Sequence, residues 1–143
     1  MRYLGIDYGS RRIGLAVGDG RLRIASPLET VAAADDPTRD AAAVLARAAE
    51  AEAEALVVGM PLNMDGSSGP QAQRTRRFIA ALEAAGRLPV HEQDERLTSA
   101  AADEALDAAG VAPRRRRKRR DMLAARVILQ QFLDALPARD SMR

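Results

Sequence analysis

The chain has 143 residues, of which 47% are apolar and 3% aromatic, with a net charge of +2, so we expect one domain with an aliphatic core. It has no cysteine, which excludes disulfides, thiolate metal sites and cysteine catalysis and agrees with a reducing compartment. No apolar run reaches the roughly 20 residues of a membrane span, and the first residues follow a strand pattern rather than a signal peptide, so we expect a cytoplasmic protein that binds no membrane.

Apolar alternation and turn residues predict a meander of three antiparallel strands at the start of the chain. The first strand carries one carboxylate, Asp7, close to its end. Gly9 and Ser10 supply a tight turn into the second strand. A second turn at residues 18–20 leads into a third strand, which Pro27 interrupts.

Helices and buried parallel strands are expected to alternate over the rest of the chain. Asp36 and Pro37 form a helix start, with an N-cap followed by proline at the first helical position. The expected elements are a helix over 37–52, a strand over 55–59, a helix over 70–85, a strand over 88–95, a helix from Thr98 or Ser99 to Ala109, and a last helix over 121–136. This order predicts an α/β fold whose mixed five-stranded sheet has three antiparallel and then two parallel strands, with helices on both faces. Residues 1–137 would form the single domain and 138–143 a disordered C-terminal tail.

Three carboxylates are expected to converge at the carboxyl ends of the strands. Asp7 lies in the first strand, Asp94 or Glu95 ends the last strand, and Asp121 begins the last helix. Clustered carboxylates repel one another unless a cation lies among them. Mg²⁺ and Mn²⁺ are the natural occupants of an all-oxygen site. Two such ions about 4 Å apart could activate a water and stabilise the leaving oxygen of a phosphodiester.

Each candidate acid also has an ordinary structural explanation. Asp7 could cap the turn that follows it, Glu95 could be a polar strand end, and Asp121 could be an acid favoured by the helix dipole. His91 is the only histidine, and a single histidine in an alternating strand is more typical of a structural role than of a catalytic base.

Basic residues are concentrated immediately before the last predicted helix. Such a segment could contact a polyanion, or it could be an ordinary solvated loop. Outside this segment the acidic residues outnumber the basic ones, which favours a local contact with a polyanion. Because aromatic residues are scarce, we expect phosphate contacts rather than base stacking. The segment consists of Arg114, Arg115, Arg116, Arg117, Lys118, Arg119 and Arg120.

Two further features have a functional and an ordinary interpretation. The loop over 60–69 directly follows a buried strand, which is a common place for binding residues. Gln71, Arg74 and Arg77 share one face of the next helix. They could contact phosphate, but we favour a solvated face for them.

Four sequence motifs occur in order over almost the whole chain. They are Gly5–Gly9 with Arg12–Ala16, Val57–Gly66, Asp94–Ser99, and Asp121 with Ala124, Ala125 and Ile128–Gln130. Together they resemble the YqgF family of bacterial proteins, which are known as Holliday-junction resolvases and as pre-16S ribosomal RNA nucleases. The basic segment is denser here than we expect of that family.

The resemblance implies an RNase H-like fold and a nuclease site that holds Mg²⁺ or Mn²⁺. Its acids fall on Asp7, Glu95 and Asp121, with Asp7 bridging the ions, and it favours Glu95 over Asp94 because the glutamate of the motif precedes an arginine matching Arg96. The substrate would be a structured RNA or a branched DNA. Arg11, Arg12 and Arg96 join the basic segment as candidate nucleic-acid contacts.

Other functions remain open at this point. A non-catalytic nucleic-acid-binding module in ribosome assembly or transcription would explain the basic segment. A nucleotide-binding protein of the sugar-kinase or actin type would explain the turn after Asp7, but those proteins enclose ATP between two such domains. The chain could act as a monomer or a homodimer, and cutting a two-fold symmetric junction would favour the dimer.

Overall fold

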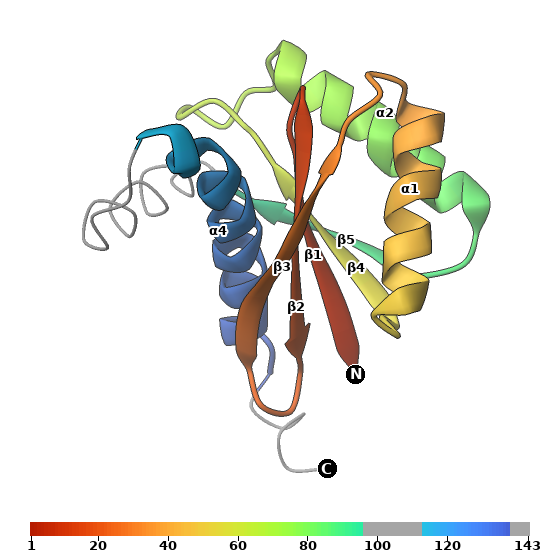
Figure 1. The fold of residues 1–143 in the computed structure, drawn as a ribbon, viewed down its shortest axis with the longest axis vertical. Coiled ribbons are helices and arrows are strands. Elements are labelled where there is room, and N and C mark those ends of the chain that lie inside the picture. The colour runs from red at the N-terminus through yellow and green to blue at the C-terminus, as the bar shows by residue number, and fades with distance from the viewer. Residues whose placement is uncertain (96–112, 138–143) are drawn as a thin grey trace.

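One five-stranded mixed sheet forms the centre of the computed structural model, which describes residues 1–95 and 113–137, the last range with backbone alone for 113–120. The strand order is β3-β2-β1-β4-β5, with the first three strands antiparallel and β1, β4 and β5 parallel (Figure 1). The predicted sheet is therefore confirmed, and the first strand is central to it. The strands are β1 (Arg2–Tyr8), β2 (Arg12–Asp19), β3 (Ile24–Ala32), β4 (Ala55–Met60) and β5 (Val90–Asp94).

Helices cover both faces of the sheet, as predicted. α1 (Pro37–Glu50) and α2 (Pro70–Ala85) lie side by side on one face, and α4 (Pro113–Asp134) crosses the other (Figure 1). The side chain of Asp36 caps α1 by accepting hydrogen bonds from the backbone N–H groups of Thr38 and Arg39, which is the predicted helix start. No helix within the described ranges is long and apolar enough to cross a membrane.

Strand alternation sorts each side chain to one of these two faces. Leu4 and Ile6 of β1 belong to the core under α1 and α2, where Phe78 of α2 is also fully buried. Tyr3 and its neighbours on the other face belong to a second core under α4. Because successive residues of a strand point to opposite faces, Gly5 and Asp7 face α4 together with Tyr3.

Glycines let α4 lie very close to the sheet. A Cβ atom at Gly5 would stand 2.7 Å from the Cβ atom of Leu129, and one at Gly14 would collide with the backbone carbonyl oxygen of Asp121. Backbone therefore lies against backbone at Gly14, which fixes the position of Asp121 relative to β2.

The last helix begins earlier than predicted. It starts at Pro113 rather than at Asp121, so the backbone of the basic segment is helical. Proline suits the first position of a helix, and arginine and lysine are good helix formers, whereas the prediction began the helix only after the basic segment. The dipole explanation for Asp121 is thus wrong, because that residue lies about two turns inside the helix.

Pro27 does not interrupt the third strand. β3 runs continuously from Ile24 to Ala32 because it is an edge strand, where a proline can face away from its neighbour. The strand register shifts between Leu15 and Ala16 of β2, opposite this proline. The helix predicted from Thr98 or Ser99 to Ala109 and the tail over 138–143 lie outside the described residues.

Candidate active site

Asp7 and Glu95 lie together at the carboxyl ends of strands that are not neighbours in the sheet. Asp7 is in β1, Glu95 directly follows β5, and β4 runs between them. The backbone N–H of Glu95 donates to the carbonyl oxygen of Met60 at 3.1 Å. At Gly59, a Cβ atom would stand 2.8 Å from Oε2 of Glu95. The absence of a side chain at Gly59 therefore lets Glu95 lie over β4 and form a hydrogen bond with Asp7.

Burial and the neighbouring acids strongly perturb the ionisation of Glu95. Its pKa is raised from 4.5 to about 8, first by burial and then by the negative charge of Asp7, by the hydrogen bond with Asp7 and by the charge of Asp94. Two carboxylates this close repel each other when both are ionised, and without a cation this repulsion costs free energy. At neutral pH the metal-free Asp7–Glu95 pair therefore retains one proton.

Asp121 belongs to the same end of the sheet but makes a different contact. Its backbone lies over Gly14, which pairs with Asp7 in the register of β1 and β2. Its Oδ2 atom accepts a hydrogen bond from Nε of Arg12 at 2.8 Å. The backbone of Asp121 is therefore close to Asp7, while its carboxylate is paired with the guanidinium of Arg12.

The donor atoms suit a hard divalent ion, although they do not form a ready-made cage. Within the described ranges, no three Asp, Glu, His or Cys side chains form a group that could hold a metal ion as they stand. The three carboxylates nevertheless offer only oxygen ligands, which Mg²⁺ and Mn²⁺ prefer. In the absence of such an ion, a proton retained by the Asp7–Glu95 pair and the cation of Arg12 offset the negative charge of the three acids.

Arg74 and Gln71 of α2 hold the turn that follows Asp7. Nη1 of Arg74 donates to the carbonyl oxygen of Gly9 and Nε2 of Gln71 donates to that of Tyr8, each at 3.2 Å. The Arg74 guanidinium also lies 4.2 Å from the centre of the Tyr8 ring. The predicted solvated face is therefore wrong for Arg74, whose side chain is only 15% exposed, whereas Gln71 and Arg77 are exposed as predicted. Their shared face was a usable signal, but the sequence does not reveal what that face meets.

Tyr8 anchors the same turn on the opposite side of the sheet from Asp7. Its ring stacks on Phe78 with centroids 4.0 Å apart, and its hydroxyl donates to the buried Asp40 at 2.5 Å. Asp40 also accepts from the backbone N–H of Ala34 at 2.7 Å. Burial and the bond to Asp40 raise the pKa of Tyr8 above its usual range, so the hydroxyl stays protonated. Sequence reasoning missed Asp40, which sits in an otherwise alanine-rich helix.

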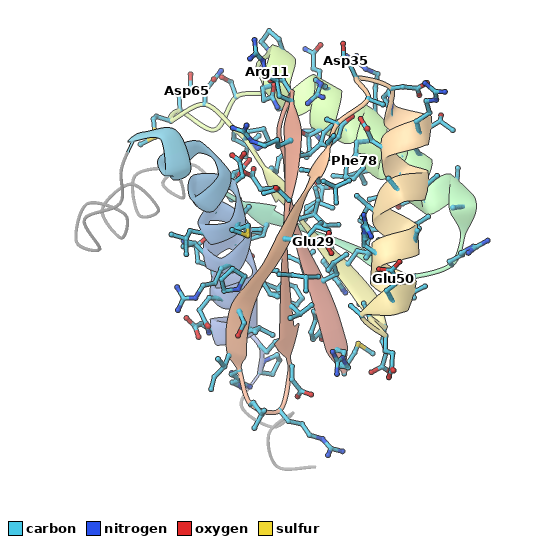
Figure 2. The ribbon with its side chains drawn as sticks, viewed as in Figure 1. Arg11, Glu29, Asp35, Glu50, Asp65 and Phe78 are labelled. Carbon is cyan, nitrogen blue, oxygen red and sulfur yellow. The ribbon has the colours of Figure 1, made fainter. Side chains whose placement is uncertain are left out.

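The loop between β4 and α2 is held by its own side chains. Nδ2 of Asn63 donates to the hydroxyl of Ser67 at 2.9 Å, and that hydroxyl donates to Asp65 at 2.6 Å. Figure 2 places Asp65 and Arg11 at the same end of the molecule, next to the start of α2. Arg11 is exposed, and this end is where the carboxyl ends of β1 and β4 lie.

Several predicted residues lie outside the site or outside the described side chains. His91 contacts Phe132, with ring centroids 5.0 Å apart, and Tyr3, at 6.4 Å, which agrees with a structural role. Asp94 is exposed, in contrast to the half-buried Glu95. Arg96 and the side chains of the basic segment 114–120 are not among those described.

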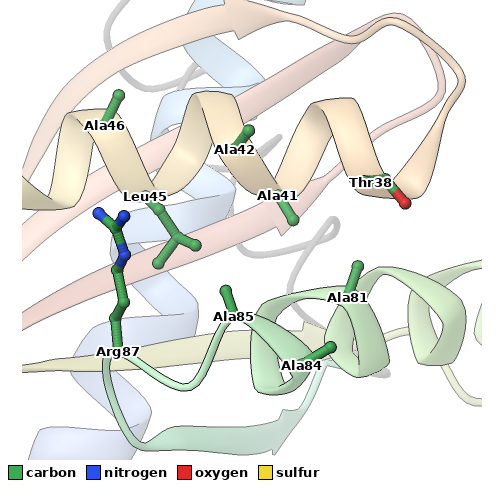
Figure 3. A pocket seen from close by; sticks show the side chains of 9 residues that line it. All are labelled: Thr38, Ala41, Ala42, Leu45, Ala46, Ala81, Ala84, Ala85 and Arg87. Atoms are coloured by element: carbon green, nitrogen blue, oxygen red, sulfur yellow. The ribbon is translucent and has the colours of Figure 1, made fainter.

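An apolar groove lies between α1 and α2, away from the acids. It has a volume of about 440 Å³ and is lined mainly by alanines such as Ala42 and Ala81, with Leu45 and Arg87 at one end (Figure 3). Because α1 and α2 cover the face opposite α4, this groove has no part in the arrangement around Asp7.

A family model described as "RuvX: Holliday junction resolvase" matches residues 1–135 of this chain. Similar proteins include one from Chloroflexus aggregans, 46% identical over 132 residues that cover 92% of each chain. Another, from Anaeromyxobacter dehalogenans, is 48% identical over 134 residues that cover 94% of this chain and 97% of the relative. Both carry the name "Putative pre-16S rRNA nuclease".

Solved structures with a similar fold include RuvC from Thermus thermophilus. RuvC in complex with a Holliday junction substrate superposes with a TM-score of 0.55 at 20% identity, covering 94% of each chain. A second RuvC structure from this organism gives a TM-score of 0.50 at 22% identity, covering 94% of this chain and 95% of the other. These likenesses confirm the RNase H-like fold class.

Proposed function

This chain belongs to the RuvX family of Holliday junction resolvases, also called YqgF, and we propose that it is a divalent-metal-dependent endonuclease that cuts structured nucleic acid. The observation that carries the proposal is the contact between Glu95 and Asp7, with the pKa of Glu95 raised to about 8. Paired carboxylates with perturbed ionisation at the ends of sheet strands are typical of a catalytic site rather than of a structural one.

We assign Asp7, Glu95 and Asp121 as the ligands of Mg²⁺ or Mn²⁺. When bound, the ion supplies activation of a water and stabilisation of the leaving oxygen. Glu95 has to lose its proton to act as a ligand, and Asp121 has to turn its carboxylate towards the other two acids. Tyr8, Gln71 and Arg74 hold the turn behind Asp7 so that its carboxylate stays in place.

We propose that the basic residues bind the phosphates of the substrate. Arg11 is exposed at the turn between β1 and β2, close in sequence to Asp7. The basic segment is continuous with the helix that carries Asp121, so a polyanion bound there would lie near the acids. We include Arg96 and all seven residues of Arg114–Arg120 in this assignment, whereas Arg12, the remaining candidate, is paired with Asp121.

Precursor 16S ribosomal RNA, at its 5′ end, is the substrate we favour. This choice rests on relatives that carry pre-16S rRNA nuclease in their names and match this chain over almost its full length. The family description names a DNA junction instead, so a branched DNA is the competing substrate. We further propose a cytoplasmic location and a single domain over residues 1–137, acting as a monomer on RNA or as a homodimer on a junction.

Parallel cleavage assays would test this function. Purified protein is incubated with a labelled precursor RNA and with a four-way DNA junction, each with Mg²⁺, Mn²⁺ or EDTA. Asp7→Asn is the control, and its melting temperature shows whether it is folded. We expect metal-dependent cutting that Asp7→Asn abolishes, and the preferred substrate identifies the class.

Two other results would contradict the proposal. Binding without cutting in every lane would favour the non-catalytic nucleic-acid-binding module. Cutting that a folded Asp7→Asn variant retains would remove this acid from the mechanism.

A further inference from the structure

Arg12 directs its guanidinium at an acid of the site rather than at open solvent. It is the first residue of β2, and its Nε atom donates to Oδ2 of Asp121 at 2.8 Å. The Arg12 side chain is 31% exposed and that of Asp121 is 20% exposed. An ion pair that is largely shielded from water is screened less by solvent and salt than a surface pair. The positive charge of Arg12 therefore interacts strongly with the carboxylate of Asp121.

The three acids of the site have different partners. Glu95 lies over β4 towards Asp7, whereas the carboxylate of Asp121 is paired with the cation of Arg12. The backbone of Asp121 lies directly against Gly14, two residues further along β2 than Arg12. The backbones of Arg12 and Asp121 are therefore close together, and the carboxylate of Asp121 is the group that Arg12 holds.

We propose that Arg12 is an internal counter-cation that holds Asp121 in the metal-free protein and competes with a divalent ion for this carboxylate. The inference rests on the proposed function, because it takes Asp121 as a metal ligand. Arg12 is then a positioning residue: it keeps the third acid aligned and the site stable without metal. The binding of an ion, rather than folding alone, brings all three carboxylates together.

Mn²⁺ binding to the metal-free protein tests the competition. Arg12→Gln keeps a hydrogen-bond donor but removes the charge, and we expect it to bind Mn²⁺ about tenfold more tightly, because a unit charge within a few ångströms changes such equilibria by about that factor or more. Arg12→Lys keeps the charge and should restore weak binding. Arg39→Gln removes a positive charge from the exposed surface of α1 and should change the affinity less than about twofold.

A double-mutant cycle in EDTA tests the contact without any metal. We expect Arg12→Gln and Asp121→Asn each to lower the melting temperature, and the double variant to lose clearly less than the sum. A purely structural arginine would lower stability without tightening Mn²⁺ binding.

The outcomes separate this inference from the proposed function. A wild-type protein that cleaves and binds Mn²⁺, with Arg12→Gln binding no more tightly, would overturn the counter-cation role and leave the nuclease standing. If Arg12→Gln and Asp121→Asn lowered the melting temperature additively in EDTA, the proposed interaction between Arg12 and Asp121 would likewise be overturned. A wild-type protein that neither binds Mn²⁺ nor cleaves would overturn the proposed function, and the competition with it.

Discussion

Glu95 forms a hydrogen bond with Asp7 across the whole width of strand β4. The two residues belong to strands that do not pair, and the contact depends on the missing side chain at Gly59. A single glycine in a fully buried strand therefore controls the distance between two acids of the candidate active site.

Gly59→Ala is expected to separate these acids. The new methyl group would collide with Ile128 and stand 2.8 Å from Oε2 of Glu95. Overpacking of this kind costs about 1–3 kcal/mol of stability, and we expect cleavage to fall at least about tenfold, because small displacements of catalytic groups are costly. Gly69→Ala is the control, since its Cβ atom would meet nothing closer than 3.5 Å. Full activity in folded Gly59→Ala would show that the contact is not used.

Stability of the metal-free protein is expected to fall as the pH rises. The pKa of Glu95 is about 8 in the folded state against an ordinary value of 4.5. Between these values the folded protein holds a proton that the unfolded chain has released, so the free energy of unfolding decreases with increasing pH. Melting temperatures in EDTA from about pH 4.5 to about 8 measure this slope, which Glu95→Gln should reduce.

Divalent metal should reverse that trend. A metal binds the deprotonated carboxylate, so the stabilisation by saturating Mn²⁺ should grow with pH over the same range. Asp19 does not confuse this measurement. Its pKa is lowered, mainly by the backbone N–H of Arg21, so it affects stability only near and below its ordinary value of 3.8.

Equal slopes of melting temperature against pH for the wild type and Glu95→Gln would contradict the raised pKa of Glu95.

Arg74→Ala is expected to destabilise the protein by about 1–3 kcal/mol, because it removes a part-buried hydrogen bond to Gly9 and the contact with the Tyr8 ring. The turn behind Asp7 would loosen, so cleavage should decrease as well. Arg77→Ala on the exposed side of the same helix should stay within about 0.5 kcal/mol. Urea unfolding of both variants provides the measurement, and similar losses in the two would contradict the role of Arg74.

Neutralising part of the basic segment should weaken nucleic-acid binding in a salt-dependent way. For duplex DNA, each phosphate contact contributes about 0.9 to the slope of log affinity against log salt concentration. Replacing Arg114, Arg115 and Arg116 by Gln should therefore reduce that slope by up to about 3. Filter binding at several salt concentrations measures it, and an unchanged slope would exclude these residues from the phosphate contacts.

The sheet was predictable because its signals are local. Alternation in the first two strands, the continuous apolar run of β4 and the cap at Asp36 each act within a few residues. The start of α4 was predicted too late, at Asp121, because the prediction placed the basic segment before the helix, whereas the backbone propensity of arginine favours a helix. Pro27 was misjudged because the sequence alone does not tell which strand is at the edge.

The location of the three acids was predictable, but their partners were not. The rule that the carboxyl ends of parallel strands meet at one edge places Asp7 beside Asp94 or Glu95, and the family resemblance favours Glu95 of the two. The ion pair of Arg12 with Asp121 joins residues 109 positions apart, and no local pattern indicates it. The roles of Gly59 and Arg74 likewise depend on which element crosses above them.

α4 is one uninterrupted helix from Pro113 to Asp134. The orientation of the basic segment about the helix axis is therefore fixed relative to Asp121. Inserting one residue between Arg120 and Asp121 would rotate the basic segment by about 100° about the helix axis relative to the acid. The length and charge of the segment would be unchanged, yet its direction would be different. Because the helix is continuous, a polyanion that displaces the first turns of α4 would also displace Asp121.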